Sequence, residues 1–487
     1  MRRTQVDFSK RIREWDGFGI NYVEAAQTRD YDADPQEYGG FSLLSEAQRQ
    51  EIIALTFGED GLKPGVVKMF LDSFHQDEPG EGYKLNAPII DLDAYDHKKT
   101  THWMRAFVRE GLKVTRARGG DLDIFVTLYG PPGWMTKQKI VRGRDIDPGL
   151  KVEVAKYLVS WVKFLREKED FPVHYVAVHN EGEDWFRWPE DGTEGGLNHD
   201  YNMYWPPEQV VEFMELIPPI LKANGMGDVT VAPGETSNWY RFSEWGYADA
   251  LADNDAAIGN LGLITSHGFR GNPHPGRWYG DWRSLGIDIL RARRPDLHAW
   301  VTSTSWAKMD VFFVDEIRNN ITCAKVNAII PWAAIQRPPL WVGGDPNPGC
   351  AFRVSEDGHY DVLPGYYFYK QVSRAGQPGM AVARVVSNDS SIGLIAFASN
   401  GTDNPDAFVV MNMGAEPLSL NIQIAGTDHT VFEAYRTIPG ARESHAVPVT
   451  SLKEACAPLG DFAIQDGFIA CDVPGESVVT FFGKQKT

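Results

Sequence analysis

At 487 residues the chain is longer than one ordinary domain, and its length fits a large barrel with one smaller domain. Hydrophobic residues make up 43% of it and charged residues 23%, a composition typical of globular proteins. The net charge of −18, together with the lack of any basic stretch, argues against nucleic acid or an anionic membrane as a partner.

No apolar run approaches the roughly 18 residues that span a bilayer. The first residues, "MRRTQVDFSKRIREWDGFG", lack the apolar core of a secretory signal. We therefore expect a cytoplasmic protein, or a secreted one whose signal peptide is absent from this sequence. The four cysteines show no CxxC spacing, so we expect no metal site built on them. We also expect no cofactor. The oligomeric state stays open.

Apolar runs that end in polar residues alternate with helical patterns along most of the chain. After the first run, Ser45 and Gln48 form a capping-box pair that begins a helix, and Gly58 ends that helix. Eight runs read as strands: 16–22, 65–72, 121–130, 171–181, 228–235, 261–269, 298–306 and 324–336. This alternation predicts a (β/α)8 barrel of the TIM type. The alternative is a doubly wound open sheet, but no GxGxxG or P-loop opens any helix.

From about residue 380 the pattern changes to short alternating runs separated by Gly, Asn, Asp and Pro turns. This pattern is typical of an antiparallel β-sandwich. The opening "TQVDFSKRI" also alternates and could add a strand to it. We therefore predict a barrel over 15–375 and a sandwich domain formed by 1–14 and 376–487.

In such a barrel the active site lies at the C-terminal ends of the strands. The side chains expected there are Asp72, Tyr129, Trp134, Asn180, Glu181, Glu235, His267, Ser303 and Trp332. The densest signal is "VAVHNEGEDW", in which an apolar strand delivers Asn180 and Glu181 together. A carboxylic acid there could protonate the leaving oxygen of a glycoside, and the neighbouring amide could donate to a sugar 2-hydroxyl.

Four motifs in order resemble the clan A glycoside hydrolases, and most of all glycoside hydrolase family 30. They are "GFG" at 17–19, "LYGPPGWMT" at 128–136, the Asn-Glu pair, and "PGYYFYKQVSRAGQPGMAVARV" at 364–385. The resemblance implies that Glu181 is the general acid/base and Asn180 its neighbour. It implies that Trp134 and Trp332 are aromatic side chains around the sugar, and that His267 lies near the nucleophile.

The chain departs from that family at the end of the seventh barrel strand. A retaining glycosidase needs a second carboxylate about 5–5.5 Å from the acid/base, and the family has a glutamate where this chain has Ser303. Three explanations compete: an engineered nucleophile variant, which we favour; another acid as nucleophile, with Glu235 at a loop mouth the best candidate; or a natural pseudoenzyme that binds glycans. Glu244, in a similar "SEWG" motif, is expected on a helix instead.

The predicted function is retaining β-glycoside hydrolysis, and the chain as given is expected to bind its carbohydrate substrate but hydrolyse it poorly. Such a chain could use a glycosyl fluoride of inverted anomeric configuration as a donor. Long loops within compact domains are often functional, and those after the fourth and eighth strands favour a pocket for small glycosides. Their candidate substrate-binding residues are Trp185, Trp188, Tyr204, Trp205, Arg337 and Trp341.

Overall fold

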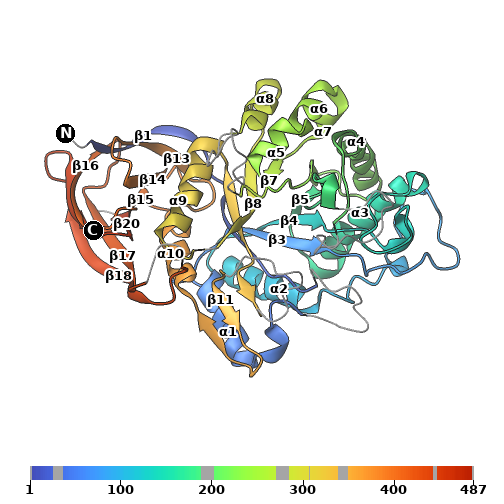
Figure 1. Cartoon of the computed structure of the whole chain (residues 1–487), viewed down its shortest axis with the longest axis horizontal. Helices are drawn as coiled ribbons and strands as arrows, with labels where there is room; N and C mark the ends of the chain where they lie inside the picture. Colours follow the sequence, from blue (N-terminus) through green and yellow to red (C-terminus); the bar gives the residue numbers. More distant parts are fainter. Residues whose placement is uncertain are drawn as a thin grey trace.

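The computed structural model describes residues 3–25, 37–187, 202–269, 284–306, 308–337, 349–442 and 447–484. Figure 1 shows a barrel of strands surrounded by helices, with a second β domain at one side that holds both the first and the last described strands. The predicted fold class is confirmed. The eight barrel strands are β2 (Gly17–Asn21), β3 (Val66–Leu71), β4 (Asp123–Leu128), β5 (Val173–Ala177), β6 (Thr230–Ala232), β7 (Ile264–Ser266), β8 (Ala299–Ser305) and β9 (Ala328–Trp332).

The barrel strands run parallel in the order β6-β5-β4-β3-β2-β9-β8-β7. Two isolated parallel bridges, Val231 with Leu261 and Thr236 with Ser266, join β6 to β7 and close the ring. Several strands are shorter than the apolar runs predicted. The residues beyond their ends still pair with those of the neighbouring strand, as in the bridge between Asn180 after β5 and Glu235 after β6.

Helices cover the outside of the barrel because each places an apolar face on it. The capping box of α1 is present as predicted: the Ser45 hydroxyl accepts from the Gln48 amide, and Gly58 follows the last helical residue. Three short helices separate β6 from β7, and Glu244 ends the first of them, as expected. The helices are α1 (Glu46–Phe57), α2 (His102–Ala117), α3 (Lys151–Glu169), α4 (Pro207–Ala223), α5 (Trp239–Glu244), α6 (Tyr247–Asp253), α7 (Asp255–Asn260), α8 (Leu285–Arg293), α9 (Val311–Asn319) and α10 (Pro364–Ser373).

The interior of the barrel is filled by side chains from neighbouring strands all along the sheet, from β3 to β9. Trp300 of β8 is fully buried there, with ring centroids 6.1 Å from Phe125 and 4.8 Å from Tyr175. Its indole nitrogen donates to the Asp16 carboxylate over 2.6 Å. Above this packed floor, the open end of the barrel is the C-terminal end of the strands.

A small sheet follows β9, formed by β10 (Ile335–Gln336), β11 (Phe352–Val354) and β12 (Tyr360–Val362). The second domain joins nine strands in one hydrogen-bonded order, β18-β17-β20-β15-β14-β13-β1-β16-β19. All neighbouring strands are antiparallel except β1 and β16. These strands are β1 (Thr4–Glu14), β13 (Ala381–Ser387), β14 (Ile392–Ala398), β15 (Ala407–Asn412), β16 (Leu418–Ala425), β17 (Val431–Pro439), β18 (Leu452–Ala463), β19 (Phe468–Val473) and β20 (Ser477–Gly483).

The β domain has a core of its own and also shares one with the barrel. Side chains from distant strands of the order, such as Phe432 of β17 and Ile469 of β19, meet in one cluster, so the sheet folds over its own apolar face. A second cluster continues from Trp15 and Phe18 of the barrel to Phe397 of β14. The two domains are therefore packed together by apolar side chains.

Among the described residues, no helix is both long and apolar enough to cross a membrane. In the same part of the chain, no cluster of three or more His, Cys, Asp or Glu side chains is placed to hold a metal ion. All four cysteines are free thiols.

Candidate active site

Glu181 lies four residues beyond the end of β5, at the C-terminal end of the barrel. Its backbone has φ 40°, in the left-handed region that disfavours a side chain, and such strain is concentrated at functional sites. The turn is held because the Glu181 amide donates to the Glu235 carbonyl over 2.8 Å. A glycine must follow, since a Cβ on Gly182 would lie 2.6 Å from the Trp205 ring. Glu181 is 8% exposed, so its carboxyl group has limited access to solvent.

His267, just beyond β7, joins two carboxylates. Its Nδ1 lies 2.8 Å from Glu181 Oε1, and its Nε2 lies 3.4 Å from Glu235 Oε2. Burial acts to lower the pKa of His267, but the hydrogen bonds to both carboxylates outweigh it and raise that pKa above its usual value. The imidazole therefore tends to carry a proton and to act as a cation between Glu181 and Glu235.

Glu235 is fully buried and paired with a lysine from the barrel wall. Lys68 of β3 places Nζ 2.5 Å from Glu235 Oε2 and also donates to the Thr302 carbonyl over 3.3 Å. Burial would raise the pKa of Glu235, but Lys68 and His267 lower it to about 2. The expectation that Glu235 stands at a loop mouth is wrong, because these two cations hold its carboxylate inside the barrel.

Ser303, the position where a nucleophile would be expected, lies in a bulged part of β8. Val301 pairs with Ile329 and Thr304 with Pro331, so two residues of β8 stand opposite one residue of β9. The Thr304 hydroxyl donates over 2.5 Å to Glu316 of α9, outside the barrel. The bulge interrupts the alternation that begins at Trp300, but counted back from the outward-facing Thr304 the next side chain, Ser303, faces the interior, where it is 2% exposed.

Aromatic side chains gather at the ends of β3, β4 and β9. Tyr129 stacks on Phe70 with ring centroids 5.0 Å apart. Trp332 meets both rings edge-on, at 6.2 Å from Tyr129 and 5.5 Å from Phe70. Trp134, on the short helix Gly133–Met135, is partly buried against the barrel core. These contacts place Tyr129 and Trp332 together in one wall of the barrel mouth.

Asp72, which follows β3, is held by two donors and is 4% exposed. Its Oδ1 accepts from the Phe74 amide over 2.9 Å, and its Oδ2 accepts from the Thr100 hydroxyl over 2.5 Å. His75 places Nε2 3.4 Å from the same Oδ2. The carboxylate is therefore fixed in position, and its oxygens keep further acceptor capacity.

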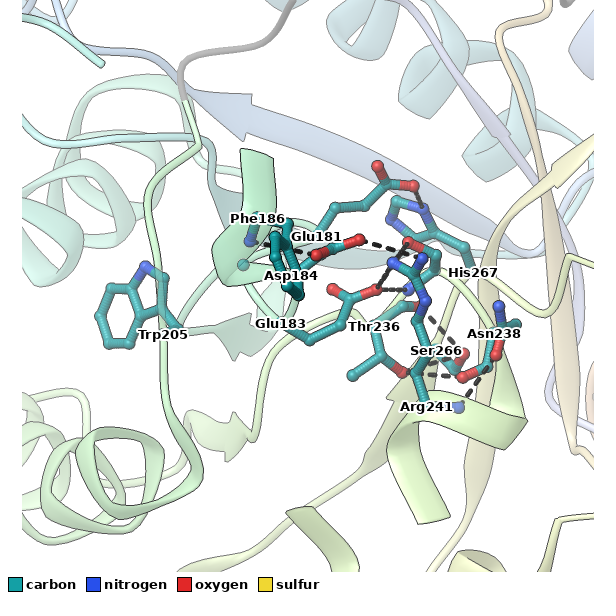
Figure 2. A network of polar contacts seen from close by, with 12 residues as sticks. Glu181, Glu183, Asp184, Phe186, Trp205, Thr236, Asn238, Arg241, Ser266 and His267 are labelled. Atoms are coloured by element: carbon teal, nitrogen blue, oxygen red, sulfur yellow. Dashed lines mark hydrogen bonds and ion pairs between the residues drawn. The ribbon is translucent and has the colours of Figure 1, made fainter. Parts of the chain in front are cut away.

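The turn after Glu181 is anchored to the α5 region by charged contacts (Figure 2). Glu183 accepts from the Ser237 amide and hydroxyl, and its carboxylate lies 3.0 Å from Arg241 Nη1. Asp184 lies 3.2 Å from the other terminal nitrogen, Nη2, of the same guanidinium. These contacts tie the chain segment that carries the acid/base candidate to α5, the first helix after β6.

The remaining loop residues lie in different surroundings. Trp185 is 44% exposed. Trp205 is not a loop wall as predicted, because it is buried at 1% exposure and stacks on His179 at 5.6 Å. Tyr204 is partly exposed beside it. Arg337 pairs with Glu356 over 2.9 Å. Trp188 and Trp341 fall outside the described residues.

Sequence reasoning missed Lys68, Glu183 and Arg241. A lysine inside the apolar run "GVVKMFLD" was a visible signal, because a buried cation requires a partner. No comparable signal marked Glu183 and Arg241, which are 58 residues apart in the sequence.

Three comparisons with known proteins bear on this site. No family model matches the chain. A Caenorhabditis elegans protein described as "Putative glucosylceramidase 4" is 25% identical over 187 residues. That alignment covers 37% of this chain and 31% of that protein, less than a third of its length.

Solved structures match over nearly the whole chain. SrfJ from Salmonella typhimurium has a TM-score of 0.71 and 13% identity, covering 99% of this chain and 93% of that one. A glycoside hydrolase family 30 subfamily 8 xylanase from Clostridium acetobutylicum has a TM-score of 0.67 and 16% identity, covering 99% and 100%. An endo-β-1,6-glucanase has a TM-score of 0.67 and 15% identity, covering 99% and 94%. The chain therefore has a glycoside hydrolase family 30-like fold.

Proposed function

We propose that the chain acts on β-linked glycosides, on the scaffold of a retaining β-glycoside hydrolase with Glu181 as its acid/base. The observation that carries the proposal is the contact between Glu181 and His267. It places a nearly buried carboxyl group at the C-terminal end of the barrel, held by an imidazole whose pKa is raised. The family 30-like fold supports the same assignment.

In a retaining enzyme of this kind, the acid/base protonates the glycosidic oxygen as the bond to the sugar breaks. The sugar is transferred to a carboxylate nucleophile, and water activated by the same residue then breaks the ester. Glu181 is proposed to perform both proton transfers. Asp72, Tyr129 and Trp332 are proposed to hold the sugar ring beside it.

We further propose that Ser303 stands where a parent enzyme has its nucleophile, so that the chain binds glycosides but hydrolyses them poorly. A serine hydroxyl carries no charge with which to stabilise an oxocarbenium-like transition state. The inward aim of Ser303 across the β8 bulge supports this assignment. A glycan-binding protein with a natural serine at 303 is the second candidate, and the same serine supports it.

Glu235 is a less suitable nucleophile than a residue at 303. Its carboxylate is 0% exposed and is neutralised by Lys68, so it has little access to an anomeric carbon.

The structural neighbours support β-xylosides or β-glucosides as substrates, since their names describe a xylanase and a β-1,6-glucanase.

The decisive experiment restores the carboxylate. Ser303→Glu should hydrolyse p-nitrophenyl β-D-glucopyranoside or β-D-xylopyranoside on the order of 10³-fold or more faster than the parent chain, with retained configuration. The double variant Ser303→Glu, Glu181→Gln should lose turnover and recover it with azide, which replaces the activated water.

Two other outcomes would favour different assignments. Substantial hydrolysis by the parent chain that Glu235→Gln abolishes would instead make Glu235 the nucleophile. Glycoside binding without turnover in Ser303→Glu would favour the glycan-binding candidate.

A further inference from the structure

Two aromatic side chains are exposed side by side just after the acid/base candidate. Trp185 is 44% exposed and Phe186 is 73% exposed. Their ring centroids are 3.9 Å apart with an interplanar angle of 28°, so the two rings stack on each other. Leaving this much aromatic surface in water costs free energy that burial elsewhere would recover. The pair therefore needs an explanation other than packing.

The pair is attached to a rigid part of the chain. The Phe186 amide donates to the Asp184 carboxylate over 3.2 Å, and that carboxylate is held by Arg241 (Figure 2). On the other side of the turn, the Trp205 amide donates to the Gly182 carbonyl over 2.7 Å. Aromatic rings whose backbone is fixed in this way lose little entropy when a ligand settles on them.

The position of the pair relative to Glu181 identifies which part of a substrate it would meet. Trp185 is four positions after Glu181, which limits the distance between their Cα atoms to about 14 Å even for an extended chain. An acid/base points at the oxygen that joins the cleaved sugar to its leaving group. A second sugar ring on the leaving-group side of that oxygen falls within this reach.

We infer that Trp185 and Phe186 form a stacking platform for the second sugar ring, on the leaving-group side of a β-linked disaccharide unit. The C–H face of a pyranose is apolar and matches the exposed face of an aromatic ring. This inference rests on the proposed function, because it takes Glu181 as the proton donor. The occupant it requires is a pyranose ring rather than another protein.

Binding to the intact chain tests the platform, because poor hydrolysis by the parent chain leaves time for titration. Calorimetry would compare methyl β-D-glucopyranoside with gentiobiose, and methyl β-D-xylopyranoside with xylobiose. The two-ring ligand of the preferred pair should bind about tenfold more tightly. Trp185→Ala and Phe186→Ala should each remove roughly 5- to 10-fold of its affinity and leave the one-ring ligand unchanged. Trp185→Phe should keep most of the extra affinity for the two-ring ligand. Phe468→Ala, which removes an exposed aromatic side chain of the β domain, should keep all of it.

Unchanged affinity ratios in Trp185→Ala and Phe186→Ala would overturn the platform and leave the proposed function standing. Loss of the one-ring and two-ring ligands together would also overturn it, because the residues would then act on the whole site. A parent chain that binds none of the four ligands would overturn the proposed function itself. Retained one-ring binding in each variant shows that the variant is folded.

Discussion

Four ionisable side chains meet beneath the barrel mouth in the order Lys68, Glu235, His267 and Glu181. Each contacts the next, and the side chains of Lys68 and Glu235 are completely buried. The opposite charges of Lys68 and Glu235, with His267 on the other side of Glu235, offset the cost of burying these groups. Glu235 therefore supports His267, and His267 in turn orients Glu181.

The row makes stability depend on pH. The pKa of His267 is raised above 6.5 in the folded protein. Its charged contacts therefore stabilise the fold fully below about pH 6.5, and this stabilisation is lost as the pH rises through the pKa of the folded state. The pKa of Glu235 is lowered from 4.5 to about 2, so its contribution is present above pH 4.5 and is lost as pH falls toward 2. The free energy of unfolding should be highest between these limits.

Thermal unfolding of the parent chain and of His267→Gln between pH 5.5 and 9 would measure this dependence. The difference in free energy of unfolding between the parent chain and His267→Gln should shrink with rising pH. It should fall by about 1.4 kcal/mol for each unit by which folding raises the pKa of His267. His102→Gln, at an exposed histidine on α2, is the control. A difference that stays constant or grows above pH 6.5 would contradict the assignment of His267 as a cation.

Lys68→Met should destabilise the fold by about 3–5 kcal/mol, because it leaves the Glu235 carboxylate buried without its cation. The double variant Lys68→Met, Glu235→Leu should recover much of that loss, because it removes both charges. Urea denaturation of the parent, both single variants and the double variant would give the coupling energy. Additive effects would mean that the two side chains do not act as a pair.

At the scale of elements, the helices and strands were more predictable than the contacts between loops. The strands of the barrel and the capping box at Ser45 depend on local pattern, which a sequence displays directly. The burial of Trp205 depends on its stacking with His179, and the position of Glu235 depends on Lys68, each from another element. Local patterns contain no information about which distant residue supplies the partner, so the site was predicted as a set of positions without its ion pairs.

Arg241→Met should loosen the turn after β5. It removes the cation from Glu183, whose side chain is 0% exposed, and from Asp184, so the free energy of unfolding should fall by about 2–3 kcal/mol. Urea denaturation would measure this loss. The matched control is Arg166→Met, whose partner Asp228 is 59% exposed, and its effect should stay below about 1 kcal/mol. Equal effects of the two substitutions would argue against an anchored turn.

At the scale of the whole molecule, the barrel and the β domain share apolar and charged contacts. Arg442 of the β domain pairs with Asp310 at the start of α9 over 2.5 Å and with Glu476 of its own domain over 3.0 Å. With the shared core around Phe397, these contacts couple the two domains. Calorimetry should show one unfolding transition with equal calorimetric and van't Hoff enthalpies. A chain ending at residue 375 should fail to give a cooperative transition, and two separate transitions in the intact protein would contradict the coupling.

The bulge in β8 separates the geometry of position 303 from its chemistry. The extra residue between Val301 and Thr304 sets which side chain faces the interior, and the backbone pairing that defines it involves no side-chain atom of residue 303. A change of one residue there alters charge and reactivity without changing where the side chain points. Under the proposed role of residue 303, a lineage could thus exchange a catalyst for a receptor, or the reverse, by a single substitution that leaves the backbone of the site unchanged.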